Sequence, residues 1–367
     1  MIFTGLRLQS FRNYDSTEIN FAPGANYFAG ANGHGKTNLL ESIYLFGLAR
    51  SFRTAHESDM VKADAASYEC HATLKSPVSV SHNVSIIYQH RKKTISIDRK
   101  KIQSYARLVG LIPMVLFSPE DHKITSGSPA DRRRFLNILL SQADKKYLQN
   151  LQEYTRILRH RNKLLELIQI NKARRHELVA WDAALAHPAL NLYAARHNFL
   201  KETSSRLGRV YTEISDNRDN LTAEYCFSKN EKITDTETFC EVLAKYREQD
   251  IIRRQTSIGP HRDDLRFLLA GMAVKNHASR GEQKSALLAL KIAEYHYLKK
   301  IQTKTPVLLC DDIYSELDDK RQQNVIAQIT SVGQSFITTT HHTFPLTPDD
   351  AFFAIKDGNI EEDRCSK

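Results

Sequence analysis

The chain has 367 residues, enough for two domains or for one large domain that carries an insertion. Its composition, with 41% hydrophobic and 26% charged residues, is that of an ordinary globular protein and excludes an intrinsically disordered chain. The 52 Lys and Arg exceed the 42 Asp and Glu, so the net charge is +10. This excess predicts an acidic partner: nucleic acid, an anionic membrane or phosphate groups.

Membrane-spanning and secreted proteins do not fit the sequence. The longest apolar stretch, residues 109–117, is interrupted by Pro113 and is too short to cross a bilayer. The first residues lack the basic-then-apolar layout of a secretion signal. The five cysteines form no CxxC pair and no metal-binding spacing; they are Cys70, Cys226, Cys240, Cys310 and Cys365. We therefore expect a cytoplasmic protein with reduced thiols.

The first hundred residues predict strands around one helix. Residues 3–11, 17–21 and 26–29 have strand patterns, and a Pro-Gly turn at residue 23 separates the last two. Apolar residues then follow one helix face from Leu39 to Gly47. Three further runs between residues 68 and 100 predict a sheet rich in hairpins.

The middle of the chain has a helical pattern. From Asp131 to Ser215 the residues are mostly helix-forming and charged, and leucines recur every seven residues from Leu151 to Leu165. Breaks at Asn171 and Pro188 predict two or three long helices, packed as a short antiparallel coiled-coil-like arm. A plain helical subdomain has the same composition and remains an alternative. An α/β pattern returns after Gly259, with a helix at 282–301 and strands at 307–310 and 334–340.

Residues 30–37, GANGHGKT, match the phosphate-loop pattern G-x-x-x-x-G-K-[ST] between a predicted strand and a predicted helix. The glycines let backbone N–H groups approach phosphate oxygens, and the helix N-terminus adds positive charge. Lys36 is suited to the β- and γ-phosphates and the Thr37 hydroxyl to Mg²⁺. The residues expected at the nucleotide are Gly30, Ala31, Asn32, Gly33, His34, Gly35, Lys36, Thr37 and Asn38.

A second acidic element supports a nucleotide site. The apolar run 307–310 ends in Asp311 and Asp312. Asp311 is expected beside the Mg²⁺ held by Thr37, and Asp312 is placed to orient the attacking water or to accept its proton. An acidic loop at a strand end is common by itself, but its pairing with the Gly-Lys-Thr loop favours a nucleotide site.

The segment 278–283, ASRGEQ, precedes the acidic strand by about one helix. Ser279 and Gly281 at a helix start predict a second anion-binding N-terminus, which could serve the nucleotide of another subunit. A serine with a glutamate three residues later is also an ordinary capping box that needs no ligand. Ser315–Asp318 and His341 in the following sequence favour the functional interpretation.

These motifs together resemble the head domains of ABC-type ATPases that act on DNA, the SMC and Rad50 group, and most closely the RecF family. The similar blocks cover nearly the whole chain: LRLQSFRNY, GANGHGKTNLLESIYLFG, LFSPEDHKITSGSPADRRRFLN, IGPHRDDL, SRGEQK and LLCDDIYSELD. The resemblance implies an α/β ATPase head with an α/β lobe and a β-rich lobe. It predicts that the head comprises residues 1–118 and 259–367 and that an inserted helical arm comprises residues 119–258.

The resemblance also implies a function. RecF proteins dimerise around two ATP molecules, bind DNA as dimers, act with RecO and RecR, and help to load RecA at single-strand gaps. The expected activity is therefore that of a recombination mediator in repair, replication restart and SOS induction. By position, Lys36, Asp311, Asp312 and His341 are the expected catalytic residues, with His342 as the alternative to His341. Ser279 and Gly281 would reach the partner's γ-phosphate, and Ser315–Asp318 would lie along the dimer interface.

Some positions differ from the wider ABC pattern. The signature segment lacks a leading leucine and has Arg280 where transporters have glycine, and Asp312 replaces a glutamate. We therefore expect a weak, DNA-stimulated ATPase that acts as a switch. The two other classes that we considered are a transporter ATPase subunit, which the long basic insertion disfavours, and a DNA-binding scaffold that does not hydrolyse ATP, which the intact phosphate loop disfavours.

The positive charge is concentrated in two segments. Residues 132–175 contain 12 Lys or Arg and 3 Asp or Glu, and residues 91–107 contain 7 Lys or Arg and 1 Asp. A solvated helix face and a basic hairpin would account for such runs, but with the resemblance we expect both to contact the backbone of double-stranded, single-stranded or gapped DNA. The individual residues predicted to contact DNA are Arg132, Arg133, Arg134, Arg159 and Lys163.

Overall fold

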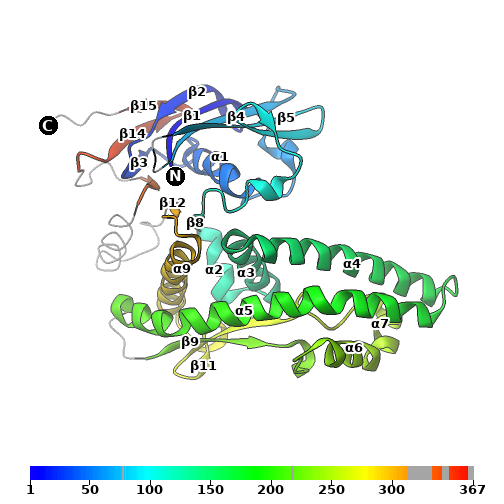
Figure 1. Ribbon diagram of the computed structural model, residues 1–367. Coiled ribbons are helices and arrows are strands. Elements are labelled where there is room, and N and C mark those ends of the chain that lie inside the picture. The colour runs from blue at the N-terminus through cyan, green and yellow to red at the C-terminus, as the bar shows by residue number, and fades with distance from the viewer. Residues whose placement is uncertain (77, 79, 216–218, 313–332, 341–346, 363–367) are drawn as a thin grey trace. The chain divides into compact units, whose positions relative to one another are not determined.

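The computed structural model describes residues 1–367 except 77, 79, 216–218, 313–332, 341–346 and 363–367. Its Cα positions divide into two compact units (Figure 1). The first comprises Met1–Asp121 and Leu298–Lys367, and the second comprises His122–Tyr297. Among the described residues, no helix is long and apolar enough to cross a membrane.

An antiparallel sheet of six strands forms one layer of the first unit, in the order β2-β1-β4-β5-β6-β7. Its strand β4 buries every second residue from Tyr68 to Leu74, so one face of the sheet lies against the core. The strands predicted in residues 3–11 and 68–100 are confirmed. The bounds are β1 Ile2–Phe11, β2 Tyr14–Asn20, β4 Tyr68–Lys75, β5 Ser81–Gln89, β6 Lys92–Ile97 and β7 Lys100–Lys101.

A second sheet of six strands has the order β15-β14-β3-β13-β12-β8. All its neighbouring strands are parallel except β15, which pairs antiparallel with β14. Every residue of β3, β8, β12 and β13 is buried, as expected for parallel strands covered on both faces. The bounds are β3 Ala25–Ala29, β8 Met114–Phe117, β12 Val307–Cys310, β13 Ser335–Thr339, β14 Ala351–Lys356 and β15 Asn359–Glu362.

Helix α1 (Lys36–Leu48) lies in the core of this unit, with its residues buried on all sides from Leu39 to Leu48. The ring of Phe46 meets that of Phe3 in β1 at 6.1 Å between centroids, and α1 also contacts β13 of the other sheet. Contacts with both sheets hold α1, the helix that follows the phosphate loop, in the core of the unit. The described residues of this unit also include three short 3-10 helices: η1 Glu57–Met60, η2 Tyr105–Arg107 and η3 Pro119–Asp121.

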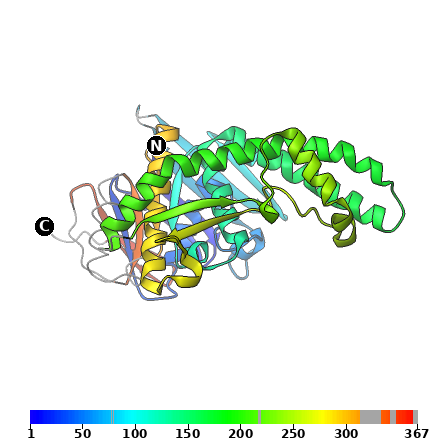
Figure 2. The same cartoon turned by 90° about the horizontal axis from the view of Figure 1, so that it is seen from below.

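The second unit is mostly helical, as predicted. Its two longest helices, α4 (Lys145–Gln169) and α5 (Leu178–Ser215), lie side by side up to the turn that joins them (Figures 1 and 2). The other helices are α2 His122–Ser126, α3 Pro129–Ala143, α6 Thr236–Lys245, α7 Arg247–Arg253, α8 Val274–His277 and α9 Arg280–Gln302, with 3-10 turns η4 Arg175–Glu177 and η5 Ser228–Asn230. The last residues of α9 belong to the first unit.

One predicted break in the helical segment is wrong. The chain does turn near Asn171, but Pro188 lies inside α5 and does not interrupt it. A proline within a helix removes one backbone hydrogen bond and costs about 3 kcal/mol. Leu185, Ala189 and Leu192, on either side of it, are completely buried, and this packing offsets the cost.

A small sheet, in the order β11-β10-β9, also belongs to the second unit. Its strands are β9 Leu221–Cys226, β10 Asp264–Leu269 and β11 Met272–Ala273. Because β10 pairs with β9, residues 259–297 pack with the helical unit. The predicted end of the insertion at residue 258 therefore differs from the compact unit, which continues to Tyr297.

Candidate nucleotide site

The phosphate loop connects the end of β3 to the start of α1, the predicted context. Gly33 and Gly35 have φ values of 87° and 109°, in the region that side chains disfavour. A Cβ on Gly35 would also lie 2.5 Å from Nδ2 of Asn13. Only glycine fits there, since the chain must turn into α1 while the turn between β1 and β2 lies against it.

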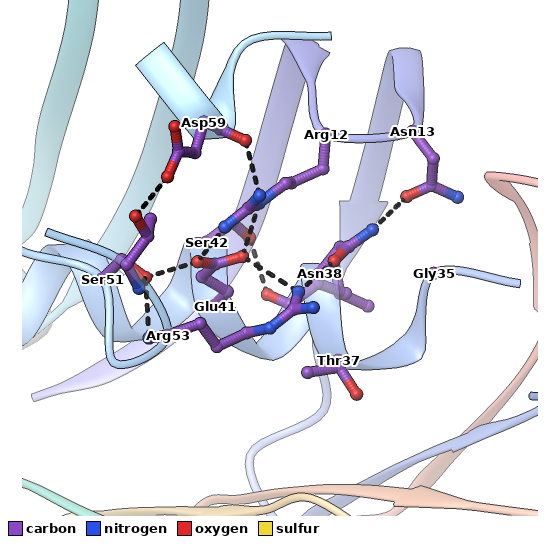
Figure 3. A network of polar contacts seen from close by, with 12 residues as sticks. Arg12, Asn13, Gly35, Thr37, Asn38, Glu41, Ser42, Ser51, Arg53 and Asp59 are labelled. Carbon is purple, nitrogen blue, oxygen red and sulfur yellow. Dashed lines mark hydrogen bonds and ion pairs between the residues drawn. The ribbon is translucent and has the colours of Figure 1, made fainter. Parts of the chain in front are cut away.

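Two side chains outside the motif, Asn13 and Tyr14, bond to this loop. The amide of Asn13 donates to the carbonyl of His34 (3.2 Å) and accepts from the Asn38 amide (2.7 Å). The hydroxyl of Tyr14 donates to the carbonyl of Gly35 (3.0 Å). Figure 3 shows Asn13 and Asn38 close to Gly35, at the end of the loop. The β1–β2 turn thus holds the carbonyls of His34 and Gly35. Of the loop N–H groups, that of Gly30 donates to the carbonyl of Thr339 (3.3 Å).

The side chain of Lys36, the first residue of α1, lies over the phosphate loop. Its Nζ donates to the carbonyls of Gly30 (2.6 Å) and Ala31 (3.0 Å). Burial lowers the pKa of Lys36, and the nearby carboxylates of Asp312 and Asp311 act in the opposite direction. The ammonium is therefore bonded to the loop and lies within the electrostatic influence of the two acidic residues at the end of β12.

Thr37 and Asp311 are hydrogen-bonded. The Thr37 hydroxyl lies 2.8 Å from Oδ1 and 3.1 Å from Oδ2 of Asp311. Thr338 of β13 donates to the same Oδ1 at 2.9 Å. Burial raises the pKa of Asp311, while the hydrogen bonds from Thr37 and Thr338 lower it and the charge of Asp312 raises it. The predicted metal pair thus lies beyond the ends of β3 and β12, which are separated in the sheet by β13, the strand that carries Thr338.

These two side chains suit a magnesium ion chemically. Mg²⁺ prefers hard oxygen ligands and is usually held in nucleotide sites by one or two protein groups together with phosphates and water. The Thr37 hydroxyl and the Asp311 carboxylate are such ligands, and they lie within hydrogen-bond distance of each other.

Asp312 follows directly, with a left-handed backbone at φ 49°. Its N–H donates to the Thr338 hydroxyl at 2.8 Å. This backbone conformation is uncommon for a residue other than glycine and is held by the contact with β13. Asp312 therefore leaves the strand in a direction set by Thr338. The sequence motifs did not predict this role of Thr338. The available signal was a run of threonines at the end of an otherwise apolar strand.

Ser279 and Gly281 lie in the second unit, at the start of α9. The Ser279 hydroxyl accepts from the N–H of Glu282 at 3.3 Å, and the Glu282 carboxylate accepts from the N–H of Ser279 at 2.7 Å. The hydrogen bonds that Ser279 makes to this carboxylate, the one from its N–H foremost, lower the pKa of Glu282. The capping box that the sequence allowed is therefore present. His341, His342 and Ser315–Asp318 lie outside the described residues.

Two of the five arginine and lysine side chains predicted to contact DNA serve the interior of the second unit. Arg132 is buried and pairs with both carboxylate oxygens of Asp264, at 2.7 and 2.9 Å. Arg133 donates to the carbonyl of Asp263 at 2.8 Å. These contacts join the block around residue 132 to the GPHRDDL block. DNA contact by Arg132 and Arg133 stays a prediction. The other three, Arg134, Arg159 and Lys163, are exposed.

The model of the "RecF/RecN/SMC N terminal domain" family matches residues 2–359. A protein of Alkaliphilus oremlandii named "DNA replication and repair protein RecF" is 36% identical and covers 98% of this chain and 100% of its own length. A Streptococcus suis protein of the same name is 35% identical and covers 97% of this chain. The chain belongs to the RecF family.

Solved structures agree with this RecF membership. A RecF solved with ATP, described as a recombination mediator of the RecFOR pathway, matches with a TM-score of 0.91 and 30% identity, covering 98% of this chain and 97% of its own. An Smc head domain derived from Pyrococcus furiosus matches with a TM-score of 0.54 and 16% identity over 98% of this chain, which concerns the fold alone. The fold is that of an ABC-type ATPase head, as predicted.

Proposed function

We propose that this RecF-family protein is an ATP-dependent, DNA-binding recombination mediator. It would act with RecO and RecR to load RecA at gaps, in recombinational repair, replication restart and SOS induction. The observation that carries the proposal is the bond between Thr37 and Asp311 beneath an intact phosphate loop. The RecF solved with ATP, which matches the whole chain at 30% identity, supports ATP as the nucleotide.

In the proposed reaction, the loop N–H groups and Lys36 bind the triphosphate. Lys36 exchanges its present acceptors, the Gly30 and Ala31 carbonyls, for phosphate oxygens. Asp312 orients the attacking water or accepts its proton. Mg²⁺ held by Thr37 and Asp311 would neutralise phosphate charge. The short carboxylate of Asp312 and its constrained backbone are consistent with slow hydrolysis. We propose that DNA stimulates this hydrolysis and that the protein uses it as a switch.

We further propose that ATP joins two copies of the chain. Ser279 and Gly281 would meet the γ-phosphate bound by the partner copy. Helix α9 has 23 residues, so its N-terminus carries a substantial positive dipole. The Ser279 hydroxyl is held at that end by Glu282. His341, or His342, is the proposed residue that senses the γ-phosphate, and Ser315–Asp318 are proposed for the interface.

DNA contact is proposed for the exposed members of the two basic segments. In the segment 91–107, Lys93 is largely buried and bonded to Glu57, but its neighbours on the hairpins are exposed: Arg91, Lys92, Arg99, Lys100 and Lys101. In the helical segment, Arg161 is completely buried between Asp182 and Asp250. The exposed candidates there are Arg134, Arg156, Arg159 and Lys163. Contacts of this kind bind phosphate without reading sequence.

The decisive experiment measures DNA binding with and without ATP. Single-stranded, double-stranded and gapped DNA of equal length are titrated at two salt concentrations. We expect ATP to increase the affinity and the higher salt to reduce it, since phosphate contacts release counterions. Equal binding with and without ATP would contradict the switch. DNA binding without any ATP turnover would favour a scaffold in its place.

A further inference from the structure

Glu41 is a buried acidic residue on α1 that no part of the proposed reaction uses. Its side chain is 0% exposed, and three segments converge on it (Figure 3). Arg12 donates from Nε to one carboxylate oxygen (2.8 Å) and from Nη2 to the other (2.7 Å). The Ser51 hydroxyl donates to it, and Nη1 of Arg53 lies 3.5 Å away. A completely buried carboxylate is costly unless it is paired, so its presence requires an explanation.

One path from Glu41 leads to the phosphate loop through Arg12. Arg12 has a left-handed backbone, φ 53°, and its Nη1 also donates to the carbonyl of Asp59 (2.5 Å). These side-chain contacts hold the tight turn between β1 and β2. The next residue, Asn13, bonds to the His34 carbonyl and lies against Gly35. The position of the loop therefore depends on a turn that Glu41 holds.

A second path runs through Ser51. Its hydroxyl oxygen accepts from the N–H groups of Arg53 (2.9 Å) and Thr54 (3.1 Å), so the contact with Glu41 fixes the start of segment 51–54. Arg53 then donates to Oδ1 of Asn38 at 2.7 Å. Asn38 follows Thr37 directly and also bonds to Asn13. Both paths thus meet at Asn38, in the first turn of α1, where a phosphate would bind.

We propose that Glu41 is a positioning residue for the ATP site. Its carboxylate holds the β1–β2 turn and segment 51–54 against the phosphate loop and thereby sets the affinity of the loop for the triphosphate. This role rests on the proposed function only in that the loop binds ATP. A purely structural role would affect stability without a selective effect on nucleotide affinity, and this difference can be measured.

The test compares Glu41→Gln with Asp264→Asn. Both remove one carboxylate from a bidentate arginine pair, but Asp264 pairs with Arg132 in the second unit. The Kd for Mg-ATP is measured by calorimetry, together with kcat and KM. For Glu41→Gln we expect Kd and KM to rise about tenfold while kcat at saturating ATP stays near wild type. Asp264→Asn should bind ATP as the wild type does. Glu41→Gln with wild-type Kd would overturn the proposal.

If circular dichroism shows that Glu41→Gln does not fold, a second variant tests the proposal. Asn13→Ala leaves the pair between Glu41 and Arg12 in place and removes the link from the turn to the loop. We expect it to weaken Mg-ATP binding about threefold or more. Wild-type affinity in Asn13→Ala would refute the role of Glu41. A wild-type protein that binds no ATP would contradict the proposed function itself, independently of Glu41.

Discussion

The Thr37 hydroxyl and the Asp311 carboxylate lie 2.8 Å apart, although 274 positions separate them in the chain. The two residues follow strands β3 and β12, which are separated in the sheet only by β13. Thr338 of that intervening strand bonds to Asp311 and to the N–H of Asp312. The carboxyl ends of three parallel strands therefore assemble the acidic half of the nucleotide site beside the phosphate loop, which is where open α/β sheets bind ligands.

Replacing Lys36 by alanine should abolish ATP binding. The ammonium lies over the loop, bonded to the Gly30 and Ala31 carbonyls, and the variant leaves the triphosphate without this cation. Calorimetry should show no binding at a concentration that saturates the wild type. Lys62→Ala, which removes a lysine paired with Asp15, is the control and should bind normally. Normal binding by Lys36→Ala would show that the loop acts without its lysine.

Ser279→Ala should bind ATP but should not dimerise in response to it. The variant removes the contact proposed with the partner's phosphate. It also removes a capping hydroxyl from α9, which lowers the free energy of unfolding by about 1 kcal/mol. Ser128→Ala, at the start of α3 in the same unit, controls for the loss of a serine at a helix start. Sedimentation with and without ATP gives the readout. ATP-driven dimers of Ser279→Ala would contradict a site shared between subunits.

Asp311→Asn should unfold at a higher temperature than the wild type at pH 7. Burial raises the pKa of Asp311, so the native state binds this proton more tightly than the unfolded state and loses stability as pH rises through these pKa values. The amide removes that cost, a gain of about 1 kcal/mol. Thermal unfolding without nucleotide between pH 4 and 8 measures it, and the gain should shrink toward low pH. A gain that is independent of pH would contradict this origin.

His261 should make the second unit sensitive to acid. It is bonded to the Tyr154 hydroxyl (2.6 Å), and burial lowers its pKa to about 3. Because the unfolded chain binds this proton near pH 6.5, the native state loses about 1.4 kcal/mol per pH unit between about pH 6 and 4. His261→Gln should be less stable than the wild type at pH 7.5, with the difference shrinking as pH falls. Chemical unfolding at a series of pH values tests this, and parallel curves would refute it.

Removing the exposed charges of Arg99, Lys100 and Lys101 should weaken DNA binding and its salt dependence. Each lost phosphate contact reduces the slope of log K against log salt by about 0.9 for double-stranded DNA. Fluorescence anisotropy over a range of salt gives both quantities. A triple alanine variant at Lys201, Lys299 and Lys300, exposed lysines outside the two basic segments, is the control. The same loss in both triple variants would mean that the effect follows net charge alone.

Local patterns in the sequence were sufficient for much of this protein. The phosphate loop, the strand before it and the helix after it were predicted, because the glycines, Lys36 and the apolar periodicity act over a few residues. The antiparallel strands of residues 68–100 were predicted for the same reason, since one face of that sheet is buried and the other is polar. The capping box at Ser279 is also local, with a serine and a glutamate three residues apart.

Other features depended on contacts that no local pattern contains. Arg132 and Arg161 look like surface charge in the sequence, yet they are buried against Asp264, Asp182 and Asp250, far along the chain. Pro188 predicts a break, but packing on both sides keeps α5 continuous. In the sequence, nothing distinguishes Glu41 from an exposed helix residue. In the structure it is buried, and two arginines from separate segments lie against it.

The sequence by itself thus determined the chemistry of the loop and the type of each main element, because both depend on residues within one or two turns of each other. Only the tertiary structure decided which charges are available to a ligand. A charged side chain can be buried when an opposite charge compensates for its lost hydration, and that partner can come from anywhere in the chain. Such pairs distinguish the arginines that hold the second unit together from those that remain exposed.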